Sequence, residues 1–424
     1  MNREQPIDSP IRRYIAAGLM LGLALLLLGG AMPGPRQVRN GLLAQQVAGY
    51  GFNLVTWEAE ALSQKLADAL NAPAAELSPA DGAAEVLAYV ARARALSARG
   101  AELSRLYSDD PEADKATIAS LEAEIATLRS EQDARRSQVE QIMEWQVRDE
   151  LARAGLVTWG RVFPPVQFSF SEPPHKLVVS PRERIDQLYY RMLTPAMSLT
   201  AIEEAETGIR DEAGLSAYVA SIGGLGAYPT MVIDRAGLPW LLNTVAHEWT
   251  HNYLTLGPLG IRYSAGNDLT IMNETVAEIV GDEIGARALA RYYPDVAAAQ
   301  AAAAEKPATQ EEAAEEPVFD FNVEMRATRL EVDRLLAAGE VDAAEAYMET
   351  RRREFVANGY SLRVLNQAYF AFHGAYGSSP ASSSPLAVQL FQLREQAPDV
   401  GAFLKQVRGF RSPDDLQAAL DAGE

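Results

Sequence analysis

The chain of 424 residues contains no cysteine. This absence excludes disulfide bonds, thiolate metal ligands, a cysteine nucleophile and a lipid anchor on cysteine, and it leaves the redox compartment open. Histidine is scarce as well, with four residues in the whole sequence. A metal site that uses imidazole ligands must therefore be built from very few residues.

Basic residues are in deficit, since 38 Lys and Arg face 57 Asp and Glu and leave a net charge of −19. A protein that holds nucleic acid by its phosphates needs a basic surface, so we expect no nucleic-acid partner. Apolar residues make up 48% and charged residues 22% of the chain, which is ordinary for a protein that buries a core. Length and composition together predict a globular protein of two or three domains.

Two of the four histidines lie close together in residues 240–251, WLLNTVAHEWTH. On a helix, His247 and His251 share one face one turn apart, which is the spacing that a tetrahedral zinc ion needs from two imidazoles. The apolar residues around them predict that the other side of this helix is buried. A buried helix that carries two histidines and a glutamate is costly unless these are paired. We therefore predict a zinc site, with Glu248 placed to polarise a water molecule.

A third ligand is expected further along the chain. The sequence after His251 reads NYLTLGPLGIRYS and lacks the third histidine of a metzincin site. Glu274, Glu278 and Asp282 follow, four residues apart, and so share one face of a second predicted helix. A solvated acidic face has the same spacing. Beside two histidines, we expect Glu274 to bind the metal and Glu278 to accept a hydrogen bond from the free ring N–H of a ligand histidine.

These two segments resemble the gluzincin metallopeptidases, which include the thermolysin-like enzymes and the zinc aminopeptidases. The resemblance rests on His247-Glu248-x-x-His251 and on the later run from Asn273-Glu274 to Glu278. It implies a zincin-like catalytic domain that holds one zinc ion per chain and hydrolyses a peptide or protein substrate. The residues it implies are His247, His251 and Glu274 as ligands, Glu248 as general base and Glu278 as support for a ligand histidine. It leaves open whether the enzyme is an aminopeptidase or an endopeptidase.

A later segment, LRVLNQAYFAFHGAYG, carries the best candidates for the remaining chemistry. On a helix, Tyr369, His373 and Tyr376 fall at i, i+4 and i+7 and share one face. Attack on a peptide carbonyl develops an oxyanion, which a phenol or imidazole donor stabilises, and the gluzincins carry such donors after the third ligand. We therefore predict the oxyanion donor in this stripe, although a hydrophobic core has the same pattern. Tyr253 and Tyr263 are the rival candidates.

Residues 14–32 carry no charge over nineteen positions, which is long enough to cross a bilayer as a helix. Arg12 and Arg13 precede this run and favour an N-terminus inside the cell. A signal peptide cleaved near Gly29-Gly30-Ala31 is the competing interpretation. We expect a single-pass membrane anchor within residues 1–36 and an extracytoplasmic catalytic domain. The alternative is a protein secreted after signal cleavage.

Residues 37–155 are rich in Ala, Leu, Glu and Arg, and residues 112–151 keep a three-four spacing of apolar positions. This pattern predicts a helical hairpin or a short coiled coil. Such a region serves either as a stalk that forms a homodimer or as a helical layer packed on the catalytic domain.

The remaining sequence, residues 156–424, is predicted as the peptidase domain. Alternating β-formers in VQFSF and KLVVS predict strands, and we expect helices over 181–193 and near 199–213. The glycine-rich residues 221–233 precede the histidine helix. They predict either an edge strand that pairs with a substrate backbone, as the resemblance implies, or a tight connection. Residues 296–316 are alanine-rich and acidic and predict an insertion that serves as a flap or a solvated excursion.

These patterns together predict an α+β fold, mainly α with a small β-sheet. The alternative function is a non-catalytic zinc-binding or scaffold protein whose helical stalk holds partners. Glu248 favours the enzyme, because a purely structural zinc site does not need a base beside its ligands.

Overall fold

The computed structural model describes residues 35–71, 77–109, 115–305 and 319–423. The chain forms two compact units, residues 1–49 and residues 50–424. The described part of the first unit contains helix α2 (Pro35–Gln46) and the start of the short helix η1 (Ala48–Tyr50). The predicted membrane anchor lies outside the described residues. Within the described ranges, no helix combines the length and the apolar character that a membrane span requires.

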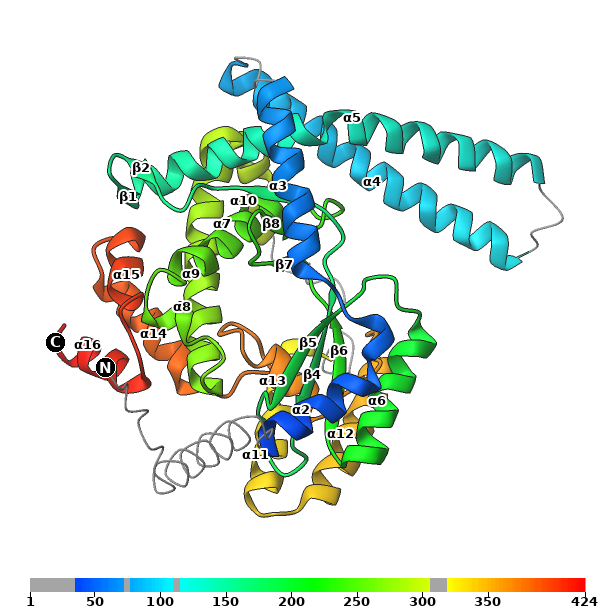
Figure 1. The fold of residues 1–424 in the computed structure, drawn as a ribbon, viewed down its shortest axis with the longest axis vertical. Helices are drawn as coiled ribbons and strands as arrows, with labels where there is room; N and C mark the ends of the chain where they lie inside the picture. Colours follow the sequence, from blue (N-terminus) through cyan, green and yellow to red (C-terminus); the bar gives the residue numbers. More distant parts are fainter. Residues whose placement is uncertain (1–34, 72–76, 110–114, 306–318, 424) are drawn as a thin grey trace, which may run out of the picture. The chain divides into compact units, whose positions relative to one another are not determined.

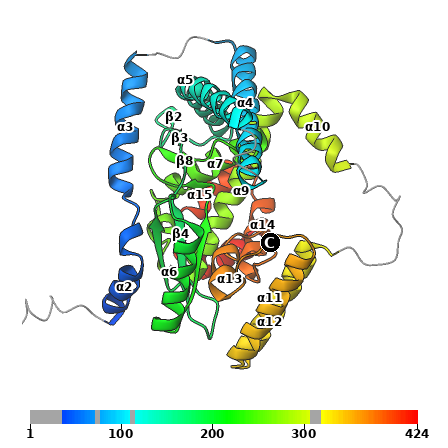
Figure 2. The same cartoon turned by 90° about the vertical axis from the view of Figure 1, so that its right-hand side faces the viewer.

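The second unit is mainly helical (Figure 1). Its longer helices are α3 (Leu54–Asn71), α4 (Pro79–Asp109), α5 (Lys115–Arg153), α6 (Leu199–Ala213), α7 (Leu238–Leu254), α9 (Asn267–Tyr292), α10 (Pro294–Glu305), α11 (Phe321–Ala337), α12 (Val341–Ala357) and α14 (Pro385–Gln396). Its shorter helices are α8 (Pro258–Ile261), α13 (Gln367–His373), α15 (Val400–Val407) and α16 (Pro413–Asp421). Helices α11 and α12 lie side by side (Figure 2).

Three small sheets accompany these helices. An antiparallel ribbon joins β1 (Val157–Thr158) to β2 (Arg161–Val162). The other two sheets have the orders β3-β8-β7 and β5-β4-β6, with strands β3 (Phe168–Phe170), β4 (His175–Ser180), β5 (Tyr189–Leu193), β6 (Ser216–Ser221), β7 (Gly224–Leu225) and β8 (Thr230–Val232). Strand β7 is therefore an edge strand, and β4 is buried between two neighbours. Helices with small sheets confirm the predicted α+β class.

Helices α7 and α9 form the centre of the unit and position the site. Their apolar faces share one core, in which Leu241, Val245 and Ile284 are almost completely buried. Two glycines bring the helices close together. A Cβ on Gly281 would lie 3.0 Å from the Cβ of His247, and a Cβ on Gly285 would lie 2.7 Å from the backbone of α7. Glycine disfavours a helix interior by about 1 kcal/mol, so these two residues indicate that close approach of the helices is required here.

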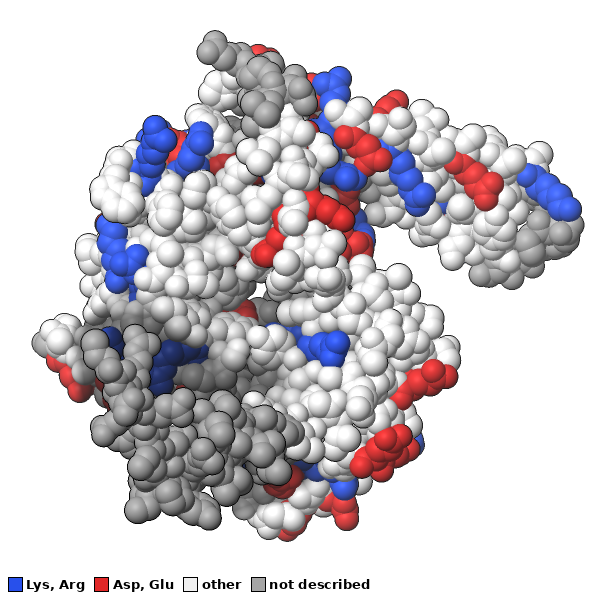
Figure 3. All heavy atoms as spheres, in the orientation of Figure 1, with Lys and Arg blue, Asp and Glu red and all other residues white. Residues whose placement is uncertain are grey.

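Helices α4 and α5 run side by side as the predicted hairpin. Tyr89 of α4 and Met143 of α5 belong to the same core as α7 and α9. The pair Arg135–Glu85 links the two helices near this core, and Arg99–Glu124 links them further out. Acidic and basic side chains alternate along the hairpin on the face drawn in Figure 3. The base of the hairpin is thus a layer of the main unit, which differs from the predicted boundary at residue 155.

Two other segments differ from the expectation. Residues 181–193 do not form a helix, because residues 189–193 become strand β5, which pairs antiparallel with β4. Tertiary pairing with an apolar strand overrides the local helical pattern there. The predicted insertion 296–316 begins as helix α10, which extends to Glu305, and its residues 306–316 lie outside the described ranges. The helix expected near 199–213 is confirmed as α6.

Candidate metal centre

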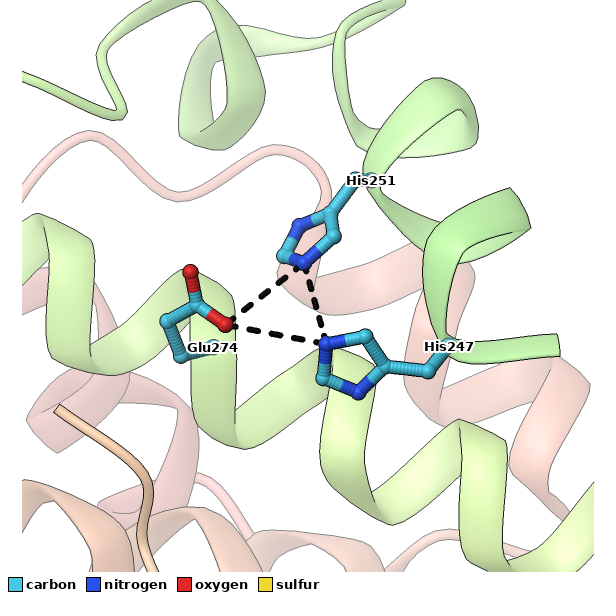
Figure 4. A group of neighbouring side chains, drawn as sticks. All are labelled: His247, His251 and Glu274. Carbon is cyan, nitrogen blue, oxygen red and sulfur yellow. Dashed lines mark hydrogen bonds and ion pairs between the residues drawn. The ribbon is translucent and has the colours of Figure 1, made fainter. Parts of the chain in front are cut away.

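Three predicted ligands converge between α7 and α9 (Figure 4). The Nε2 atoms of His247 and His251 lie 3.1 Å apart. Each of them is 3.6 Å from Oε2 of Glu274. Each of the three residues offers one potential ligand atom, and these atoms all lie within 4.8 Å of one another. The structure therefore brings His247, His251 and Glu274 together, as the sequence predicts.

The two carboxylate oxygens of Glu274 have different surroundings. Tyr263 donates its phenolic hydrogen to Oε1 at 2.5 Å. Oε2 is buried and has no hydrogen-bond partner among the described residues, and it is the oxygen that faces both histidines. Burial by itself would raise the pKa of Glu274, but the two histidines outweigh burial and hold that pKa well below its ordinary value. A buried carboxylate oxygen without a donor is costly, so this oxygen fits a site that receives a metal ion.

Asn273 orients the ring of His251. Its side-chain Oδ1 lies 2.7 Å from Nδ1 of His251, and its amide nitrogen donates to the carbonyl of Leu259 at 3.3 Å. Because the amide nitrogen is already used, the oxygen must face the ring, and Nδ1 of His251 must carry the hydrogen. In the neutral imidazole, which is the form that binds a metal, Nε2 is then the lone-pair atom that faces His247 and Glu274. This is the arrangement that a metal-binding imidazole requires.

Glu248 lies between the two histidines and is 7% exposed. Among the described residues, none donates a hydrogen bond to its carboxylate. Burial raises the pKa of Glu248, although His247 and His251 act in the opposite direction. Strand β7 runs directly over this carboxylate, because a Cβ on Gly224 would collide with it and a Cβ on Gly226 would lie 3.0 Å from His251. The glycine-rich segment thus forms an edge strand that approaches Glu248 closely.

These groups share one cavity of about 220 Å³. The edge strand β7, the two histidines, Glu248 and Glu274 line it, together with apolar side chains such as Met192, Ile222 and Leu225. A cavity of mainly apolar character with a few convergent polar groups is typical of a binding site for a small ligand or a side chain. The site therefore combines a metal-type donor set, an unengaged carboxylate and a half-buried edge strand.

The predicted oxyanion stripe is divided by the structure. Helix α13 ends at His373, so Tyr376 lies in the turn beyond it rather than on the same helical face. Glycine at position 374 ends the helix, since it is a poor helix former. Tyr376 lines the cavity, with its ring 6.4 Å from that of His247. Burial raises the pKa of Tyr376 well above its ordinary value, and the nearby glutamates raise it further.

The other two members of the stripe face the core. The ring of Tyr369 packs 4.2 Å from that of His373 and 5.3 Å from that of Tyr218. His373 Nε2 lies 3.3 Å from the hydroxyl of Tyr218, and burial lowers the pKa of His373 to about 4. Neither residue lines the cavity that contains the candidate ligands. The prediction that Tyr369 and His373 act beside the metal is therefore not supported by their positions.

Glu278 is also placed differently from the prediction. Its carboxylate accepts hydrogen bonds from the backbone N–H and the hydroxyl of Ser378. Glu278 was expected to accept the ring N–H of a ligand histidine, whereas Asn273 is the residue that contacts Nδ1 of His251. A spacing of four residues brings Glu278 to the same side of α9 as Glu274, but one turn farther along, where the chain after α13 meets it. Glu278 thus fastens that segment to α9.

Of the two rival tyrosines, Tyr263 belongs to the site and Tyr253 does not. Tyr263 lines the cavity, but its hydroxyl is committed to Glu274. Tyr253 stacks on Trp249 at 5.3 Å in the core.

Lys176 of strand β4 lines the same cavity and was not singled out from the sequence. It is 8% exposed, and burial lowers its pKa, while Glu274 and Glu248 oppose that effect. In the sequence, Lys176 opens the strand KLVVS, and a lysine at the start of a strand is usually exposed. Only the placement of β4 between β5 and β6 buries it, so the sequence carries no clear signal for its role.

Comparison of this chain with protein-family models, with curated proteins and with solved structures found no match.

Proposed function

We propose that this protein is a zinc-dependent peptidase of gluzincin type, with one zinc ion held by His247, His251 and Glu274. The observation that carries the proposal is the convergence of two imidazole nitrogens and an unpartnered carboxylate oxygen next to a free carboxylate, Glu248. Two histidines and a glutamate form one of the ligand sets of catalytic zinc, which keeps its fourth position open. When bound, zinc supplies Lewis-acid chemistry that polarises a carbonyl and makes a water more acidic.

Glu248 is the general base of the proposed reaction. Its carboxylate lines the cavity and is not engaged by a donor among the described residues. Burial raises its pKa, which brings a carboxylate closer to the value that favours proton transfer near neutral pH. Glu248 would accept a proton from the attacking water and deliver it to the leaving amine.

Tyr376 is the donor that we assign to the oxyanion. Its side chain lines the cavity, and among the described residues its hydroxyl has no hydrogen-bond partner. Its raised pKa keeps the phenol protonated, so it remains a donor. Tyr263, by contrast, holds Glu274 in place and so positions a ligand.

We propose that the substrate backbone binds along the free edge of β7. This strand pairs with β8. Its residues Gly224 and Leu225, together with Gly226 directly after it, line the cavity. An extended peptide can add to such an edge through main-chain hydrogen bonds. Because Gly224 lies against Glu248, a peptide in that position would be held beside the base.

We further propose that residues 14–32 anchor the protein in the membrane, with the peptidase outside the cytoplasm or secreted after cleavage. Digestion of the folded domain by protease added outside intact cells tests this location. Protection of the domain until the cells are lysed would contradict it.

The outer half of the α4–α5 hairpin is the proposed homodimer contact. The alternative function, a non-catalytic zinc-binding scaffold, shares the ligands but not the need for Glu248.

The deciding experiment is Glu248→Gln, which keeps the size of the side chain but removes its ability to accept a proton. Zinc should stay bound at one ion per chain, while hydrolysis of a mixed peptide library should fall by roughly 10²–10⁴-fold. Glu278→Gln is the matched control, since its carboxylate binds Ser378 outside the site, and it should keep activity within a few-fold.

Three outcomes separate the alternatives. Loss of zinc in Glu248→Gln would make Glu248 a structural residue. Absence of hydrolysis by the zinc-loaded wild type would favour the non-catalytic scaffold. If the wild type cleaves, products that lack single N-terminal residues identify an aminopeptidase, and internal cuts identify an endopeptidase.

A further inference from the structure

Lys176 is the only lysine or arginine among the residues that line the cavity of the candidate metal centre. It comes from β4, the middle strand of its sheet, and its side chain is enclosed by three aromatic rings. The ammonium nitrogen lies 5.4 Å from the ring centre of Tyr190, 5.9 Å from that of Tyr263 and 5.6 Å from that of Phe372. These rings come from three different segments, so the chain builds an aromatic cage around one amine.

This amine has no anionic partner among the described residues. No carboxylate oxygen of these residues lies within 4.0 Å of its nitrogen, and none of them accepts a hydrogen bond from it. An ammonium group has three N–H donors, and burying it without an acceptor is energetically unfavourable. Cation–π contacts return part of that cost, but they leave the donors unused.

A second buried lysine shows what a structural lysine in this protein looks like. Lys65 of α3 forms ion pairs with Glu140 at 2.6 Å and Glu144 at 2.8 Å. The two carboxylates also accept the backbone N–H groups of Phe170 and Phe168. The ammonium group of Lys65 is thus paired with two carboxylates inside the protein, whereas the amine of Lys176 faces a cavity. The missing partner of Lys176 is therefore a molecule that enters the cavity.

Tyr263 connects Lys176 to the metal ligands. Its ring faces the amine, and its hydroxyl donates to Oε1 of Glu274. A single side chain thus lies between the cationic group and the ligand set. An anion bound to Lys176 would lie next to the reacting carbonyl of a substrate.

We propose that Lys176 binds a carboxylate of the substrate, carried by a residue next to the scissile bond. This inference rests on the proposed peptidase function and adds to it a substrate class. The carboxylate has two chemical sources in a peptide, which are the C-terminal α-carboxylate and the side chain of Asp or Glu. The same amine and the same three rings would accept either one.

The test uses one mixed tripeptide library in three forms: free acid, C-terminal amide, and C-terminal amide with Asp or Glu as the last residue. The zinc-loaded wild type should cleave the free acid with a kcat/KM roughly 10- to 100-fold higher than the plain amide, which is the range for a charged hydrogen bond. If the amide that ends in Asp or Glu is cleaved as fast as the free acid, a side-chain carboxylate is sufficient for binding to Lys176. If it is cleaved as slowly as the plain amide, Lys176 binds only the C-terminal α-carboxylate. Equal rates for all three forms would overturn the proposal while leaving the peptidase function intact.

Lys176→Met keeps the length and the apolar stem of the side chain and removes the charge. It should lower cleavage of the free acid to the rate of the amide and leave the amide rate within a few-fold. Lys176→Arg should keep part of the preference. Lys405→Met is the matched control, because that lysine donates to the carbonyl of Gly155 far from the cavity lining, and it should keep the full preference.

A binding measurement separates this inference from the proposed reaction. In zinc-free wild-type protein, the free-acid library should raise Tm more than the amide library does, and Lys176→Met should abolish the difference. If this difference appears but the zinc-loaded enzyme cleaves nothing, the carboxylate site stands and the peptidase function fails. If the two libraries raise Tm equally, no carboxylate site exists at Lys176. A Lys176→Met protein that fails to fold does not affect the comparison of the two libraries on the wild type.

Discussion

The α7–α9 pair and helix α13 present the same sequence pattern but differ in structure. Both carry histidine and other polar side chains at helical spacing. In α7 and α9, these groups leave an unpartnered carboxylate oxygen and a free glutamate that face a cavity. In α13, Tyr369 and His373 pack on each other and on Tyr218. Helical spacing determines only that residues share a face. The chemistry depends on whether that face leaves polar atoms without partners inside a cavity.

The largest effect should separate the two regions by metal content. Glu274→Ala removes the proposed carboxylate ligand, so zinc should fall from one ion per chain to a trace. His247→Ala and His251→Ala should have the same effect. His373→Ala, a matched loss of a histidine in the α13 region, should keep the full zinc content. Elemental analysis of the purified variants measures this. A Glu274→Ala protein that remains loaded would move the third ligand elsewhere.

The second prediction compares two tyrosines from the same predicted stripe. Tyr376→Phe removes the hydroxyl that lines the cavity, and kcat should fall by roughly 10²–10³-fold with zinc retained. Tyr369→Phe removes a hydroxyl in the core and should leave kcat within a few-fold. Steady-state kinetics on one good peptide provides the measurement. Equal effects of the two substitutions would remove the distinction between the regions.

The smallest effect concerns the residues that hold the ligands. Tyr263→Phe frees Oε1 of Glu274, and Asn273→Ala frees the ring of His251, so each should weaken zinc binding by roughly 10–100-fold. Competition with a chelator gives the affinity. Glu278→Gln serves as the reference, since its carboxylate binds Ser378. If Glu278→Gln alone weakened zinc binding, the original assignment of Glu278 as the support for a histidine would be restored.

The sequence predicted the parts of the site that depend on local spacing. His247, Glu248 and His251 share one helix, so helical geometry was sufficient to group them. Glu274 lies on the next long helix, and it was assigned to the site from the acidic spacing beside the two histidines and from the resemblance to the gluzincins. The α+β class followed from periodicity in the same way. Strand β4 and helix α6 were also recognised from their local patterns.

The parts that depend on tertiary packing could not be predicted. Asn273 and Glu278 both lie close to Glu274 on α9, so the sequence does not show which of them contacts a histidine. The rotation of α9 against α7 decides that Asn273 contacts His251. The separation of Tyr376 from Tyr369 depends on where α13 ends. Strand β5 forms because β4 offers it an edge, and Lys176 becomes buried because two strands flank β4. In each case the deciding contact joins residues that are distant in the sequence.

The two glycines of α9 have a consequence for metal selectivity. Gly281 and Gly285 set the separation of α7 and α9. That separation determines the distance between the two imidazoles on α7 and the carboxylate on α9. A methyl group at either position would push the helices apart and widen the space between the three proposed ligands. Ions with longer bonds and more ligands, such as Ca²⁺, would then be relatively less disfavoured than Zn²⁺. Two glycines that do not contact the ion would thus influence which ion the site selects by size.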